Sequence, residues 1–163
     1  MSESFERESL PLDQLLAGLE DYEIISMVKR RDFKGGNPAI LINKRKFIIK
    51  RICPEPVSVP VGVEAVWAII SPRNNKNKKF KHIAICSLYY RGPKSTKKQE
   101  LFDHIGETYH YLSAKYGVNM EFIIAGDTNR LNLSPILNLS PRLVQAVKVP
   151  TPRIGSSEMT MAQ

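Results

Sequence analysis

The chain has 163 residues, of which 42% are hydrophobic and 25% charged, as in a globular protein with one core and unlike a disordered chain. No apolar run approaches the ~20 residues that a membrane helix needs. The acidic, polar residues 1–8 do not have the pattern of a secretory signal.

The net charge of +8 is distributed unevenly. Residues 1–23 hold seven acids and one base, and residues 24–64 hold nine bases and three acids. Residues 65–99 hold nine bases and no acid: Arg73, Lys76, Lys78, Lys79, Lys81, Arg91, Lys94, Lys97 and Lys98. This basic middle suits a polyanion-binding surface or, equally, a solvated loop without a partner.

The first half of the chain predicts one short helix and three strands. Leucines near helical spacing predict the helix over residues 10–19, and residues 22–28 suit a strand. The β-rich runs 39–43 and 47–49 flank a basic turn at residues 44–46, which predicts a hairpin.

The middle of the chain predicts two more strands and a long helix. Residues 63–70 and 81–89 suit strands, joined by a polar, basic loop over residues 71–79. Thr96 to Gln99 fits a capping box, and apolar residues at steps of three and four predict a helix over residues 101–116.

The last part predicts a strand, a turn and a short helix. Gly117 suits a left-handed helix stop, and residues 121–125 suit a strand. Ser140 with Pro141 predicts a final helix through residue 147, and residues 151–163 are predicted to be disordered. The element order predicts an α/β fold, with a mixed sheet covered by flanking helices.

The peptide Gly126-Asp127-Thr128-Asn129 follows the last predicted strand. A strand that ends there carries a carboxylate to the edge of the sheet where ligands tend to bind. Asp127 could orient or deprotonate a water, and Asn129 could donate a hydrogen bond to a phosphate oxygen. The alternative is an ordinary Asx-turn with no chemical role.

Four further segments precede this peptide in a recognisable order. They are Ser2-Glu3-Ser4-Phe5, the Gly35-Gly36 turn before residues 39–42, the strand around Glu64 and Trp67, and Ser87-Leu88-Tyr89. Together with Gly-Asp-x-Asn, they resemble the endonuclease/exonuclease/phosphatase family, most of all the endonuclease domain of non-LTR (LINE-type) retrotransposon polyproteins. The resemblance covers roughly residues 2 to 149.

The resemblance implies a two-sheet α/β sandwich that hydrolyses phosphodiesters with Mg²⁺ or Mn²⁺. It implies that Glu3 ligates the metal and that Asp127 orients or activates the attacking water. Asn129 would hydrogen-bond the scissile phosphate, and Tyr89 would contact that phosphate or assist the leaving group. Glu64 would either face solvent or support these residues.

The implied partner is a nucleic acid, most of all DNA, with no membrane partner. Arg73, Lys76, Lys78, Lys79 and Arg91 would meet its backbone. Cys53 and Cys86 lie among apolar residues without metal-ligand spacing, which predicts reduced thiols and an intracellular protein. Residence in the nucleus would follow by analogy.

Two segments of the family pattern do not match. The family has an Asn-bearing strand before the Glu motif and a Ser-Asp-His segment at its end, whereas His82, His104 and His110 lie elsewhere. The sequence therefore predicts a partial domain over residues 1–149, truncated at both ends, and a divergent tail over residues 150–163. Nuclease activity would be impaired, and a catalytically inactive nucleic-acid-binding remnant and a non-functional translated fragment stay open as alternatives.

Overall fold

The computed structural model describes residues 19–26, 38–52, 57–74, 81–90, 96–129 and 131–146. The elements in chain order are β1 (Tyr22–Ser26), β2 (Ala39–Asn43), β3 (Phe47–Ile52), β4 (Glu64–Pro72), β5 (His82–Tyr89), α2 (Lys98–Tyr116), the 3₁₀ turn η1 (Gly117–Asn119), β6 (Met120–Asp127) and α3 (Ser134–Leu137). Except for Leu19, the helix predicted over residues 10–19 lies outside the described residues, as do the tail residues 151–163.

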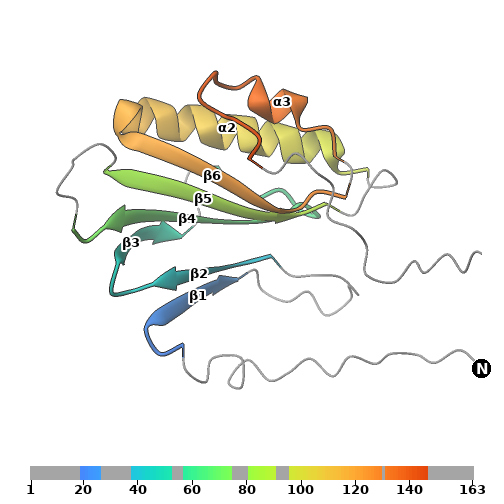
Figure 1. Ribbon diagram of the computed structural model, residues 1–163. Helices are drawn as coiled ribbons and strands as arrows, with labels where there is room; N and C mark the ends of the chain where they lie inside the picture. The colour runs from blue at the N-terminus through green and yellow to red at the C-terminus, as the bar shows by residue number, and fades with distance from the viewer. Residues whose placement is uncertain are drawn as a thin grey trace, which may run out of the picture.

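The strands form two sheets. One has four strands in the order β3-β4-β5-β6, and the other has two, β1 and β2. Helices α2 and α3 lie on one side of the four-stranded sheet, and β1 and β2 lie on its other side (Figure 1). The predicted fold class, α/β with a mixed sheet, two-sheet layering and flanking helices, is confirmed.

The four-stranded sheet is mixed because a helix connects its last two strands. β3, β4 and β5 are antiparallel, whereas β5 and β6 run parallel. Helix α2 makes the crossover between β5 and β6 that a parallel pair requires. It buries Leu101, Ile105 and Leu112 against the sheet, so the helix predicted from this spacing is confirmed.

The predicted capping box at the start of α2 is wrong. The N-cap residue is Lys97, and no side chain caps the first turn. Lys97 Nζ instead lies 2.7 Å from Glu100 Oε1, so an ion pair one turn apart stabilises this end. At the other end Gly117 has φ +58°, which suits a glycine, although its ψ of −143° differs from the left-handed stop that was predicted.

The larger core lies between the sheet and α2. Trp67 is 1% exposed, and Cys86, Ile105 and Leu112 are fully buried beside it. Complete burial of one large apolar side chain contributes about 1.5–3 kcal/mol. Cys86 is a free thiol, and burial raises its pKa far above the usual range, which makes it inert.

The smaller core lies between the two sheets. Its buried side chains come from β1, β2 and β4: Ile25, Ile40, Ile42, Val66, Ala68 and Ile70. Phe47 and Ile49 of β3 pack against this cluster and are partly buried. Strands β2 and β3 therefore both direct apolar side chains into the space between the sheets.

For this reason the predicted hairpin of β2 and β3 is wrong. β2 pairs with β1, and β3 pairs with β4, so the basic turn carries the chain from one sheet to the other. The main chain of the turn follows the same division. Lys44 N donates to Asp21 O beside β1, whereas Lys46 O accepts from Arg73 N after β4.

The predicted helix over residues 140–147 does not form within its described part, residues 140–146. Ser140 Oγ accepts a hydrogen bond from Arg142 N, and Leu143 N donates to Ser140 O, which makes only a turn. The short helix is α3 instead, where Pro135 suits the first turn and Ile136 is buried in the core.

Candidate functional site

The carboxyl ends of β5 and β6 bring predicted site residues together. Tyr89 is paired with Asp127 in the parallel ladder, and Glu64 of β4 is paired with Tyr89 on its other side. Because residues paired across a sheet share a face, these three side chains form a row on the face directed toward β1 and β2. Tyr90 points to the opposite face and is buried in the helix-side core.

Hydrogen bonds of the main chain and of two side chains hold the turn after β6 in place. Tyr90 N donates to Asp127 O at 2.8 Å, and Asn129 Nδ2 donates to Tyr90 O at 2.7 Å. Asn129 N donates to Asp127 Oδ1 at 3.1 Å, which is an Asx-turn. The Asx-turn that the sequence offered as an alternative without a chemical role is therefore present. It also fixes the Asp127 carboxylate against β5.

Gly126 allows the two strands to meet at this point. Its φ is +138°, and a Cβ atom added there would lie 1.8 Å from Leu88 O on the neighbouring strand. No real side chain tolerates such a contact, so this position requires glycine for a structural reason. The Asn129 backbone is also unusual, with φ +40°, which asparagine accepts more readily than most residues.

Tyr89, Asp127 and Asn129, called the candidate site below, retain polar atoms for a ligand. Asp127 is exposed, and no hydrogen bond is formed by its Oδ2 among the described residues. The Asn129 amide uses one of its two hydrogens for Tyr90 O and keeps the other. Tyr89 is half-buried, so the arrangement offers an anionic acceptor beside two neutral donors.

The side chains of the candidate site supply part of what a divalent cation needs. Mg²⁺ is held by one or two carboxylates together with waters and substrate phosphates. Asp127 supplies one such carboxylate, while no group of three or more acidic, histidine or cysteine side chains gathers in the described parts of the chain. The residues therefore fit a cation shared with a substrate, and Glu3, the predicted ligand, lies outside the described residues.

The remaining predicted contacts fall elsewhere. Arg73 follows β4 at the opposite end of the sheet from Asp127, because antiparallel β4 ends where β5 and β6 begin. Seven residue steps along β5 place the two ends roughly 23 Å apart. The other predicted nucleic-acid contacts, Lys76, Lys78, Lys79 and Arg91, lie outside the described residues.

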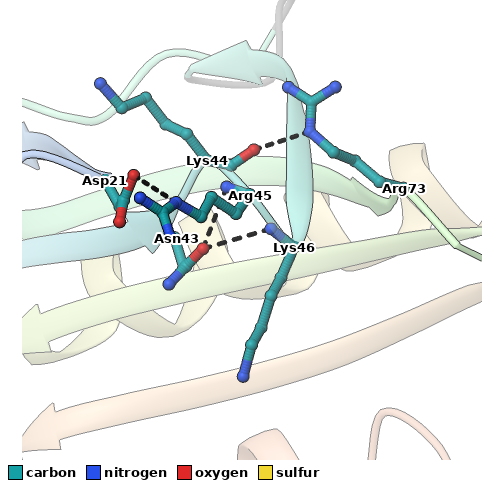
Figure 2. A network of polar contacts seen from close by, with 6 residues as sticks. All are labelled: Asp21, Asn43, Lys44, Arg45, Lys46 and Arg73. Carbon is teal, nitrogen blue, oxygen red and sulfur yellow. Dashed lines mark hydrogen bonds and ion pairs between the residues drawn. The ribbon is translucent and has the colours of Figure 1, made fainter.

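Sequence reasoning missed the residues that surround Arg73. Its Nε donates to Lys44 O at 2.6 Å, which joins it to the basic turn between β2 and β3 (Figure 2). The three consecutive bases Lys44, Arg45 and Lys46 were visible in the sequence. Their proximity to Arg73 depended on the arrangement of the two sheets, which the predicted hairpin obscured.

The described histidines play other roles. His104 is 1% exposed and accepts a hydrogen bond from Trp67 Nε1 at 3.0 Å, and burial lowers its pKa. His82 lies at the Arg73 end, 3.0 Å from Ser71 Oγ through its Nδ1. Burial lowers the pKa of His82 first, and the charges of Lys50 and Lys81 lower it further.

No protein-family profile matches the sequence, and no curated protein matches it. Among solved structures, the chain is similar to a crystal structure of humanized D. rerio TDP2 carrying 14 mutations, with 13% identity and a TM-score of 0.47. The match covers 78% of this chain and 48% of that one, so the chain spans about half of that protein's length. Within the described residues, no helix has the length and apolar character needed to cross a membrane.

Proposed function

We propose that this chain carries a metal-dependent phosphodiesterase site of the retrotransposon endonuclease type, acting on DNA. The observation that supports this most is the pairing of Tyr89 with Asp127 at the carboxyl ends of two parallel strands. This is where α/β sheets place ligands. The hydrogen bond from Asn129 to Tyr90 O fixes a third polar side chain at the same place.

In this proposal Asp127 Oδ2 accepts a proton from the attacking water or orients it, because that oxygen is the acceptor left by the Asx-turn. The second amide hydrogen of Asn129 donates to a phosphate oxygen. The Tyr89 hydroxyl donates to the same phosphate or to the leaving oxygen. Bound Mg²⁺ or Mn²⁺, held by Asp127 and Glu3, would neutralise charge on the phosphoryl oxygens.

Nicking of supercoiled plasmid DNA tests this proposal. Asp127→Asn is the informative variant, because the asparagine oxygen can still accept from Asn129 N and keep the turn. Nicking should require Mg²⁺, stop on EDTA addition and fall by about 10²–10⁴-fold in Asp127→Asn. The matched control is Asp103→Asn, an exposed carboxylate on α2, which should retain full activity.

Metal-dependent nicking that persists in Asp127→Asn would overturn the assignment of the site. The absence of nicking by folded protein that still binds DNA would favour the second candidate, a nucleic-acid-binding protein without catalysis. One observation favours that candidate in particular: Arg73 and its basic neighbours stand far from Asp127.

A further inference from the structure

The end of the sheet opposite the candidate site gathers exposed bases from several segments. The basic surface consists of Lys44, Arg45, Lys46, Lys50, Arg73 and Lys81, all of them exposed. The first three occupy one turn, and Arg73 is bonded to that turn through both its side chain and its main chain. Lys50 and Lys81 lie close enough to His82 for their charges to lower its pKa.

The turn at the centre of the basic surface is fixed by polar contacts. Asn43 Oδ1 accepts hydrogen bonds from Arg45 N at 3.0 Å and from Lys46 N at 3.2 Å. Arg73 Nε donates to Lys44 O, so the end of β4 anchors the turn from its other side. A fixed backbone lowers the entropy lost when these side chains order around a ligand.

The shape of the basic surface suits an extended ligand. In Figure 2 the side chains of Lys44 and Lys46 leave the turn in different directions, whereas Arg73 reaches toward the turn from the end of β4, so the three side chains do not converge on one point. A single anion would need convergent donors, whereas a chain of phosphates offers a charge every few ångströms. The divergent bases can therefore each meet a different phosphate of one polymer.

The acids near the basic surface lie beside β1 and at the start of β6. Asp21 pairs with Arg45 through Nε at 2.6 Å, and Glu20 and Glu23 are its exposed neighbours around the start of β1. Glu121 at the start of β6 is paired with Arg142. A polyanion would thus be repelled from the β1 side and attracted toward Arg73 and Lys81.

We propose that the basic surface binds the phosphodiester backbone of a nucleic acid, separately from the candidate site, with Asp21 competing for Arg45. Binding and phosphodiester chemistry then belong to opposite ends of the sheet. The contacts are to the backbone, so affinity carries little sequence preference and falls steeply with salt. The binding stands whether or not the chain cleaves DNA.

The test is fluorescence anisotropy with a labelled 30-base-pair duplex over a range of salt concentrations. Lys46→Gln removes one charge without touching the hydrogen bonds of the turn, and Lys98→Gln on α2 is the charge-matched control at the other end. Lys46→Gln should weaken binding severalfold and reduce the slope of log affinity against log salt by about one. The double variant Lys44→Gln/Lys46→Gln should reduce it by about two.

Asp21→Asn gives a result that misfolding cannot imitate, because it should tighten binding by freeing Arg45. Equal loss in Lys46→Gln and Lys98→Gln, or no gain in Asp21→Asn, would overturn the proposal. So would equally tight binding of polyglutamate or of vesicles with anionic headgroups, since that would show a general acidic partner. Nicking and binding are measured separately, and Asp103→Asn should bind like the parent chain, so failure of the nicking assay and failure of this binding are distinguishable.

Discussion

At the Asp127 end of the four-stranded sheet, polar side chains are held by hydrogen bonds to the strands themselves. At the Arg73 end, Lys44 and Lys46 extend from an exposed turn whose backbone is fixed by hydrogen bonds, and the Arg45 side chain of that turn pairs with Asp21. The first arrangement restricts a few atoms tightly, as positioning a reacting group requires. The second leaves the long side chains of Lys44 and Lys46 free to follow a ligand, which suits binding without chemistry.

The largest expected effect concerns Gly126, which permits the close approach of β5 and β6. Gly126→Ala would place a Cβ atom against Leu88 O and force a side chain onto a backbone with φ +138°. We expect a loss of unfolding free energy on the order of 3 kcal/mol or more. Chemical denaturation measures it directly.

Gly106→Ala is the matched control for that substitution. The nearest atom to its added Cβ is a Leu139 methyl at 3.7 Å, an ordinary contact, and the residue lies within α2. Alanine should stabilise the helix there by about 0.5–1 kcal/mol. If Gly126→Ala proved equally harmless, the two strands would not approach so closely, and the geometry of the candidate site would be incorrect.

The next comparison is between the asparagines that fix the two ends. Asn129→Ala removes the bond to Tyr90 O and leaves alanine at φ +40°, which together should cost about 2 kcal/mol. Asn43→Ala removes two exposed bonds in the basic turn and should cost about 1 kcal/mol or less. Thermal unfolding of both variants ranks them.

Asn129→Gly separates the two causes at the Asp127 end. Glycine tolerates the positive φ but cannot bond to Tyr90 O, so it should recover part of the loss. Nucleic-acid affinity should fall further in Asn43→Ala than in Asn129→Ala, because the charged contacts to the phosphates come from the basic surface. The opposite result would mean that the two ends do not divide binding and positioning between them.

The sequence predicted the Asp127 end better than the Arg73 end for a physical reason. Apolar periodicity predicts β5, α2 and β6, and their order along the chain determines the parallel pairing that brings Asp127 beside Tyr89. The end of the sheet at which Arg73 lies also follows from the sequence, because a loop that joins antiparallel β4 to β5 must lie at the amino end of β5. What the residues could not predict was the partner of β2.

The apolar, β-rich runs of β2 and β3 suit two strands that pair with each other as well as two strands that face each other across a core. The choice depended on β1 and β4, which are distant in sequence, so a local pattern favoured the hairpin incorrectly. The capping box failed for a local reason, since α2 begins at Lys98 with Lys97 as its N-cap, and Lys97 pairs with Glu100.

A smaller effect is expected from the ion pair that borders the basic surface. Asp21→Asn should change the unfolding free energy by less than about 0.5 kcal/mol, because the Arg45 side chain is 78% exposed and screened by water. Lys44 N donates to the main-chain oxygen of residue 21 and keeps that bond. Chemical denaturation of Asp21→Asn, measured together with DNA affinity, should show a higher affinity and a nearly unchanged free energy of unfolding. A large loss of unfolding free energy would instead show that the ion pair between Asp21 and Arg45 stabilises the fold.

The smallest effect is a shift in the pKa of His82, which reports the electrostatic potential at the Arg73 end. Burial is the main reason why this pKa lies below its usual value, and the charges of Lys50 and Lys81 lower it further. Lys81→Gln removes one of the two charges that disfavour the imidazolium, so the pKa of His82 should rise. NMR titration of the imidazole resonances measures it.

Duplex DNA should raise the pKa of His82 in the same direction if phosphates come to lie over Lys50 and Lys81, because their negative charge favours the protonated ring. High salt should raise it too, since at 1 M the screening length is only about 3 Å. Lys98→Gln, at the far end of the sheet, should leave it unchanged. A pKa that responds to Lys81→Gln but not to DNA would place the bound phosphates nearer to Lys44 and Arg73 than to β5.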